Sequence, residues 1–148
     1  MKNHKSPYSP IFELTRGGTV ESVHFGAIAV VDVHGRLLFS YGDPDTVTFL
    51  RSTAKPFQAL PFFEQGGPAF FNLSVPEQAI LCASHSGTDE HVATVRSIQE
   101  KVGVSEAELL CGVHKPFHEP TAERMHALKE PISANRHNCS GKHTGMLA

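Results

Sequence analysis

Apolar and polar residues alternate over the first third of the chain, with the period of two that is typical of a β-strand. The alternation runs from Val23 to Val33. It predicts one half-buried strand, because successive side chains of a strand point to opposite faces of the sheet. The turn residues His34-Gly35 come next, followed by a second apolar run over residues 36–42. The pattern therefore predicts a β-hairpin.

The period changes to that of a helix after residue 50. From Ser52 the apolar residues Phe57, Leu60 and Phe63 recur about every 3.6 residues, up to Gly66-Gly67. Pro61 lies inside this segment and is expected to bend or end the helix. N-cap residues, a capping box and apolar spacing predict further helical segments over residues 88–102, 105–108 and 121–129.

The two ends of the chain differ in character. Residues 1–15 contain no apolar core and are expected to form a flexible start, and residues 16–148 are expected to form the N-terminal part of a single domain. At the other end, the segment "CSGKHTGMLA" opens a helix and stops at Ala148 without a cap or a polar tail. Chain ends are usually well solvated, so we expect the chain to be the front part of a longer protein.

Composition narrows the functional classes. The chain has 148 residues, of which 40% are hydrophobic and 19% charged, as in globular proteins. Its longest apolar stretch, residues 25–31, is far shorter than the roughly 20 residues of a membrane span, and the N-terminus does not have the pattern of a signal peptide. A cytoplasmic location without membrane contact is expected.

The net charge of -2 argues against nucleic-acid binding. Three cysteines, an odd number, favour reduced thiols, one of them a candidate metal ligand.

A serine and a lysine stand three positions apart at the start of the first predicted helix. Ser52 and Lys55 would share one face of that helix, beside apolar residues. Burial disfavours the charged form of a lysine, and a neutral lysine is a base that can activate a serine hydroxyl. Such a tetrapeptide also occurs by chance, and the alternative is a helix-capping serine beside a lysine that extends along the surface.

Two further polar segments contain candidate chemistry. "CASHSGTDEH", residues 82–91, follows an apolar run and offers Ser84, His85 and Ser86 as nucleophile, proton carrier, substrate ligand or helix cap. Its spacing does not decide among these roles. "NRHNCSGKHTG", residues 135–145, contains His137, Cys139, Lys142 and His143. A thiolate with nitrogen donors suits zinc, although a buried inert thiol is the commoner state of a lone cysteine. "HKPFH", residues 114–118, is expected to be a loop.

Together with the preceding "RGGTVESVHFGAIAVVDVHGRLLFSYGD", the motifs "RSTAKPFQALPFF", "CASHSGTDEH" and "NCSGKHTGMLA" resemble the L-asparaginase II family, the rhizobial-type or class 3 asparaginases. The resemblance begins near Arg16 and extends over nearly the whole remaining chain. It implies an α+β fold similar to that of the serine β-lactamases and penicillin-binding proteins, of which this chain would be the N-terminal part. It also implies hydrolysis of L-asparagine to L-aspartate and ammonia, and a homodimer.

The resemblance further implies roles for individual residues. Ser52 and Lys55 match one catalytic Ser-Lys pair and Ser84 matches the serine of a second pair, with the choice of nucleophile left open. Substrate binding is expected from Arg51, His85 and His143, and zinc binding from Cys139 and Lys142. The family's third zinc ligand, a cysteine, and the lysine that serves the second serine match no residue of this chain.

Two alternatives stay open. The first is another Ser-x-x-Lys hydrolase, such as a β-lactamase or an esterase, although the missing secretion signal counts against cell-wall chemistry. The second is a truncated, non-catalytic fragment that binds a partner through its unpaired core.

Overall fold

The computed structural model describes residues 6–148 and divides into two compact units. The first extends to Phe49 and the second comprises Leu50–Ala148, and each is described by itself. The flexible start expected for residues 1–15 lies partly outside the described residues, because residues 1–5 are not among them. The single domain expected for residues 16–148 stays a prediction.

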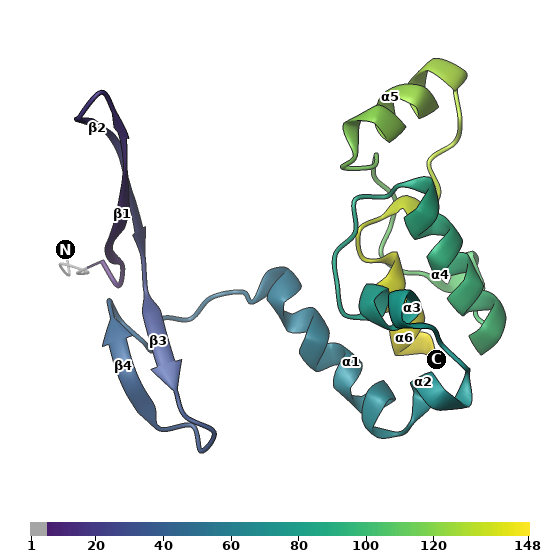
Figure 1. Cartoon of the computed structure of the whole chain (residues 1–148), viewed down its shortest axis with the longest axis horizontal. Helices are drawn as coiled ribbons and strands as arrows, with labels where there is room; N and C mark the ends of the chain where they lie inside the picture. The colour runs from purple at the N-terminus through teal and green to yellow at the C-terminus, as the bar shows by residue number, and fades with distance from the viewer. Residues whose placement is uncertain (1–5) are drawn as a thin grey trace, which may run out of the picture. The chain divides into compact units, whose positions relative to one another are not determined.

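The first unit consists of two β-hairpins (Figure 1). In the first hairpin, β1 (Ser9–Arg16) pairs antiparallel with β2 (Thr19–Gly26) through a turn at Gly17-Gly18. Both turn glycines have positive φ, 55° and 83°, as two-residue hairpin turns require. In the second hairpin, β3 (Ile28–Val31) pairs antiparallel with β4 (Leu37–Tyr41).

This unit corrects three expectations. The hairpin around His34-Gly35 is confirmed, but the single strand predicted for residues 23–33 is wrong, because the chain changes its pairing partner between β2 and β3. The flexible segment expected up to residue 15 is also wrong for residues 9–15, which belong to β1. The apolar side chains of these strands are exposed rather than half-buried, as for Phe25 at 59% and Val31 at 57%. Alternation marks the two faces of a strand, but it does not show where pairing changes or whether a second layer covers one face.

The second unit is helical. Its α-helices are α1 (Lys55–Glu64), α2 (Gly67–Phe70), α3 (Val75–Leu81), α4 (Asp89–Val102), α5 (Glu119–Leu128) and α6 (Ser140–Leu147), with short 3₁₀ turns at Arg51–Ala54, Glu106–Glu108 and Ala134–Arg136. Helices α3, α4 and α6 lie side by side (Figure 1), and the buried core between the elements of this unit consists of Leu73, Ile80, Leu81, Val95 and Ile98. None of the helices within residues 6–148 has the length and apolar character of a membrane span.

Local sequence signals explain where these helices begin and end. Thr88 caps α4, since its hydroxyl accepts a hydrogen bond from the His91 N–H, and Gly103 ends the helix with φ 76°. The helix predicted for residues 88–102 is thereby confirmed. The capping box at Ser105 is also confirmed, although it opens only a 3₁₀ turn. The predicted helix at 121–129 is α5, which begins two residues earlier because a proline fits its first turn.

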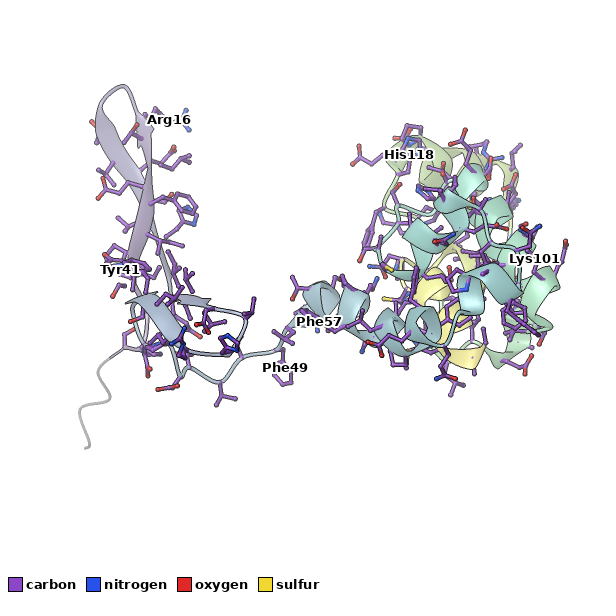
Figure 2. The ribbon with its side chains drawn as sticks, turned by 60° about the horizontal axis from the view of Figure 1, so that its bottom comes forward. Arg16, Tyr41, Phe49, Phe57, Lys101 and His118 are labelled. Atoms are coloured by element: carbon purple, nitrogen blue, oxygen red, sulfur yellow. The ribbon has the colours of Figure 1, made fainter. Side chains whose placement is uncertain are left out.

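Helix α1 begins later than predicted, and it ends next to the predicted Gly66-Gly67. It begins at Lys55, so that Ser52 lies in the preceding 3₁₀ turn. It continues through Pro61 to Glu64, so Pro61 does not end the helix. Pro61 is exposed, and Phe57 on the same helix, labelled in Figure 2, is 68% exposed. The carbonyl that loses its partner at Pro61 can therefore bond to water.

A buried carboxylate joins α3 to α4. Glu77 is 4% exposed, and it accepts hydrogen bonds from the Ser74 N–H at 2.6 Å, Ser97 Oγ at 2.7 Å and Lys101 Nζ at 2.7 Å. Lys101 lies at the rim of the helical unit (Figure 2), with its side chain one-third exposed. The bonds fix α3 just before the loop that contains Ser84.

Strands and helices occupy separate stretches of the chain, so the predicted α+β class is confirmed. The similarity to serine β-lactamases stays a prediction.

Candidate active site

The amine of Lys55 lies in the interior of the second unit. The residue is 3% exposed, at the first position of α1. Its Nζ donates hydrogen bonds to the Ala83 carbonyl at 3.2 Å, to Ser84 Oγ at 2.8 Å and to the Asn138 carbonyl at 3.1 Å. The alternative of a lysine that extends along the surface is therefore wrong, and all three N–H bonds of an ammonium group have an acceptor.

Ser84 connects Lys55 to Ser52. Its Oγ lies 2.8 Å from Lys55 Nζ and 3.0 Å from Ser52 Oγ. The three side chains that the sequence indicated as catalytic thus form one hydrogen-bonded chain, although they come from positions up to 32 residues apart. Sequence spacing suggested a direct contact between Ser52 and Lys55, whereas the described contacts lead from one to the other through Ser84. Ser52 and Ser84 are exposed, so both hydroxyls are open to a small molecule.

Arg51 has an unusual backbone conformation. Its φ is +54°, in the left-handed region that residues other than glycine seldom adopt. Its side chain is exposed, next to Ser52. Strained backbone of this kind often occurs at functional sites, and here it sets the start of the turn that presents Ser52.

His85 follows Ser84 directly and is buried, with 6% of its surface exposed. One ring nitrogen, Nδ1, accepts a hydrogen bond from the Gly87 N–H at 3.1 Å, and the other, Nε2, lies 2.8 Å from Ser140 Oγ. Burial, followed by the positive charges of His91 and Lys55, lowers the pKa of His85 to about 4. The ring is neutral at pH 7, and both of its nitrogens are occupied within the protein.

The residues predicted to bind zinc, and the predicted substrate ligand His143, lie at the start of α6. Cys139 is the N-cap residue and Lys142 lies in the first turn, and both are half-buried. His143 is next to them, and burial, with the charges of Lys142 and Lys55, lowers its pKa. The predicted substrate ligand His143 is therefore near enough to Lys55 to sense its charge.

The donor set for zinc is small. Within the described part of the chain, no group of three or more His, Cys, Asp or Glu residues is placed to hold a metal ion. Cys139 and Lys142 supply two donors, whereas structural zinc has four and catalytic zinc usually has three from the protein. The residues present therefore do not fit a complete zinc site. Cys82, Cys111 and Cys139 form no disulfide bond, and their reduced state stays a prediction.

A pocket of about 350 Å³ borders the serine loop. Its lining includes Ser84 and His85 together with Glu90, His91 and Thr94 from α4. Sequence reasoning assigned no role to the three residues of α4. It also missed the carbonyl groups that hold Lys55, because every residue has a carbonyl and no sequence pattern marks the ones that turn inward.

A lysine amine that is hydrogen-bonded to a serine hydroxyl is found in hydrolases that activate a serine with a neighbouring base. The sequence carries a more specific signal. Residues 12–148 match the family model described as L-asparaginase II, and the chain belongs to that family. This places it among the asparaginase-type amidohydrolases. No curated protein matches the chain.

Proposed function

We propose that the chain hydrolyses the side-chain amide of L-asparagine to L-aspartate and ammonia, using Ser52, Ser84 and Lys55. The observation that carries this proposal is the hydrogen-bonded chain from Ser52 Oγ through Ser84 Oγ to Lys55 Nζ, at 3.0 and 2.8 Å. Membership of the L-asparaginase II family supports the amide as the bond that is cleaved.

The surroundings of Lys55 support its role as a base. A neutral amine has two N–H bonds and one lone pair. The carbonyls of Ala83 and Asn138 can only accept, so they hold the two N–H bonds. The lone pair then faces the third neighbour, Ser84 Oγ. The neutral lysine is thereby oriented to take a proton from that hydroxyl.

Two proton routes follow from this arrangement. If Ser52 attacks the amide carbon, its proton passes to Ser84 while the proton of Ser84 passes to Lys55. If Ser84 attacks, its proton passes to Lys55 directly. In both routes the lysine ammonium returns the proton to the departing nitrogen, ammonia leaves, and a serine ester of aspartate remains. Water then adds to the ester carbonyl and loses a proton to the lysine. When the intermediate collapses, the bond to the serine oxygen breaks, aspartate leaves, and the lysine ammonium returns the proton to the serine.

Arg51 and His143 are proposed to bind the substrate. The exposed guanidinium of Arg51, next to Ser52, offers paired donors to a carboxylate, such as the α-carboxylate of asparagine. A neutral His143 ring can exchange hydrogen bonds with a substrate amide. Both roles are compatible with a small polar ligand at the serines.

Zinc remains part of the proposal only as an ion for which Cys139 and Lys142 would be ligands. These two donors leave a tetrahedral ion short of partners, so the mechanism above contains no step through a metal. The homodimer, the cytoplasmic location and the β-lactamase-like fold also stay predictions.

Ammonia release from asparagine, with glutamine as the comparison substrate, tests the function. We expect Lys55→Met to lower kcat by about 10²–10⁴-fold, the usual contribution of a general base. Ser133→Ala is the control, since Ser133 is a half-buried serine of the same unit whose side chain makes no cap hydrogen bond. Wild-type protein that releases no ammonia from either substrate would contradict the proposal.

The two serines are separated by trapping the ester. We expect an acid quench during turnover to leave an aspartyl adduct on one peptide, which mass spectrometry assigns to Ser52 or to Ser84. The alanine variant of the other serine should still form the adduct, but more slowly, if that serine only relays the proton. Full activity in both Ser52→Ala and Ser84→Ala would eliminate the serine mechanism.

A further inference from the structure

The ring of His85 connects two segments that are distant in the sequence. His85 belongs to the loop between α3 and α4, and Ser140 opens α6. The Gly87 N–H donates to Nδ1 at 3.1 Å, and Nε2 lies 2.8 Å from Ser140 Oγ. His85 is 6% exposed and Ser140 is fully buried, so solvent does not compete for these bonds.

The polarity of the groups at the two ends decides where each proton lies. A backbone N–H can only donate, so Nδ1 of His85 carries a lone pair toward Gly87. At the other end, Ser140 Oγ donates to the Asn135 carbonyl at 3.0 Å, and a carbonyl can only accept. The hydroxyl oxygen of Ser140 is then free to accept from Nε2. His85 is therefore the neutral tautomer with its proton on Nε2.

Ser140 is held in turn by a buried polar cluster. Asn135, 1% exposed, donates to Gln99 Oε1 at 3.2 Å and to Glu106 Oε2 at 2.9 Å. Gln99 donates back to Asn135 Oδ1 at 2.9 Å. The hydroxyl of Thr144 donates to the Ser140 carbonyl at 3.0 Å. Every buried side-chain N or O atom within the described residues has a hydrogen-bond partner, so this cluster is a rigid anchor for the His85 ring.

The same two segments surround the amine of Lys55. The His85 N–H donates to the Asn138 carbonyl at 3.3 Å, and Lys55 Nζ donates to that same oxygen at 3.1 Å. The other two acceptors of the amine belong to Ala83 and Ser84, the residues just before His85. Any shift of residues 83–85 against residues 138–140 therefore changes the position of Ser84 Oγ relative to the amine.

We propose that His85 is a positioning residue, whose neutral ring, protonated on Nε2, locks residues 83–87 to residues 135–140 so that three hydrogen-bond partners converge on Lys55. This inference rests on the proposed function, in which Lys55 is the base, and it gives His85 a role different from the substrate contact expected from the sequence. His91 stacks on the ring with its centroid 5.1 Å away, and Lys55, His137 and His114 also act on the ring through their charges. All four carry or can carry positive charge, which opposes protonation of His85.

The first test needs no turnover. Two-bond ¹H–¹⁵N NMR on the full chain, labelled at histidine and assigned with His85→Asn, reports the tautomer. We expect the Nε2-protonated form to persist at pH 5, where free imidazole in the same sample is protonated. Protonation together with the imidazole, or an Nδ1–H tautomer, would overturn the proposal.

Amide exchange supplies a second measurement that is independent of activity. His85→Asn keeps an acceptor where Nδ1 lies, and His85→Gln keeps a donor where Nε2 lies. We expect exchange at the Gly87 amide to speed up at least tenfold in His85→Gln and to change less in His85→Asn. Ser140→Ala should speed up exchange at the amide of residue 85. Unchanged exchange in all three variants would show that the ring locks nothing.

The kinetic test separates positioning from other roles. We expect Ser140→Ala and His85→Gln to lower kcat for asparagine about tenfold or more, with little change in KM, because the substrate keeps its contacts while the base is displaced. His126→Gln, at an exposed histidine of α5, is the control. A raised KM with unchanged kcat would assign His85 to substrate binding, and unchanged kcat and KM in the folded variants would leave it no part in the reaction. Wild-type protein without activity would refute the proposed function, whereas NMR and exchange would still decide whether the ring locks the loop.

Discussion

Replacing Glu77 by glutamine should destabilise the protein strongly, and by an amount that depends on pH. Burial alone would raise the pKa of the carboxyl, but hydrogen bonds from Lys101, Ser74 and Ser97 outweigh it and lower the pKa from 4.5 to about 2. Glutamine has nearly the same size. It loses the charge that attracts Lys101, and its NH₂ group cannot accept the bonds made to one carboxylate oxygen.

The magnitude follows from linkage. A fall from 4.5 to about 2 corresponds to about 3 kcal/mol of folding free energy, at about 1.4 kcal/mol for each pKa unit. Solvent weakens the ion pair because the Lys101 side chain is one-third exposed, so we expect about 2–3 kcal/mol. The folded-state pKa is the lower one. This stabilisation is therefore fully present above about pH 4.5 and is lost as the pH falls toward 2.

Urea unfolding followed by circular dichroism measures this difference between wild type and Glu77→Gln. We expect about 2–3 kcal/mol at pH 7 and about half of that at pH 3, because the carboxyl of the unfolded chain is protonated at pH 3 and must release its proton on folding. Glu100→Gln, at an exposed glutamate of α4, is the matched control and should change stability little. The reasoning is refuted if the difference is the same at pH 7 and pH 3.

Two further predictions concern α6. Gly141→Ala should destabilise the protein by about 1–3 kcal/mol and lower kcat, because the added Cβ would lie 2.5 Å from the Ile80 carbonyl oxygen and push α6 away from α3. Thermal unfolding measures the loss of stability, and an unchanged Tm would contradict this prediction. Cys139→Ala should lower the zinc content found by elemental analysis, whereas Cys82→Ala should leave it unchanged; equal zinc in both variants would exclude Cys139 as a ligand.

Local signals in the sequence predicted the helices well and the strands less well. Thr88 and Gly103 mark the ends of α4 because a cap is a bond between neighbours in the chain, which a sequence displays directly. The break between β2 and β3 depends instead on which segment pairs with which. Alternation is the same on both sides of Ala27, so the sequence contained no sign that the partner changes there.

The candidate site shows the same limit more sharply. Helical spacing predicted that Ser52 and Lys55, three residues apart, share one face of a helix. The family resemblance added Ser84 to the candidate catalytic residues. Neither revealed that Ser84 lies between the other two, since that order depends on how the end of α3 packs against the start of α1. The structure thus joins two separate motifs in one hydrogen-bonded chain, in which Ser84 makes the direct contact with the amine. Because the hydroxyl nearest the base loses its proton first, replacing Ser84 should slow ester formation even if Ser52 is the attacking group.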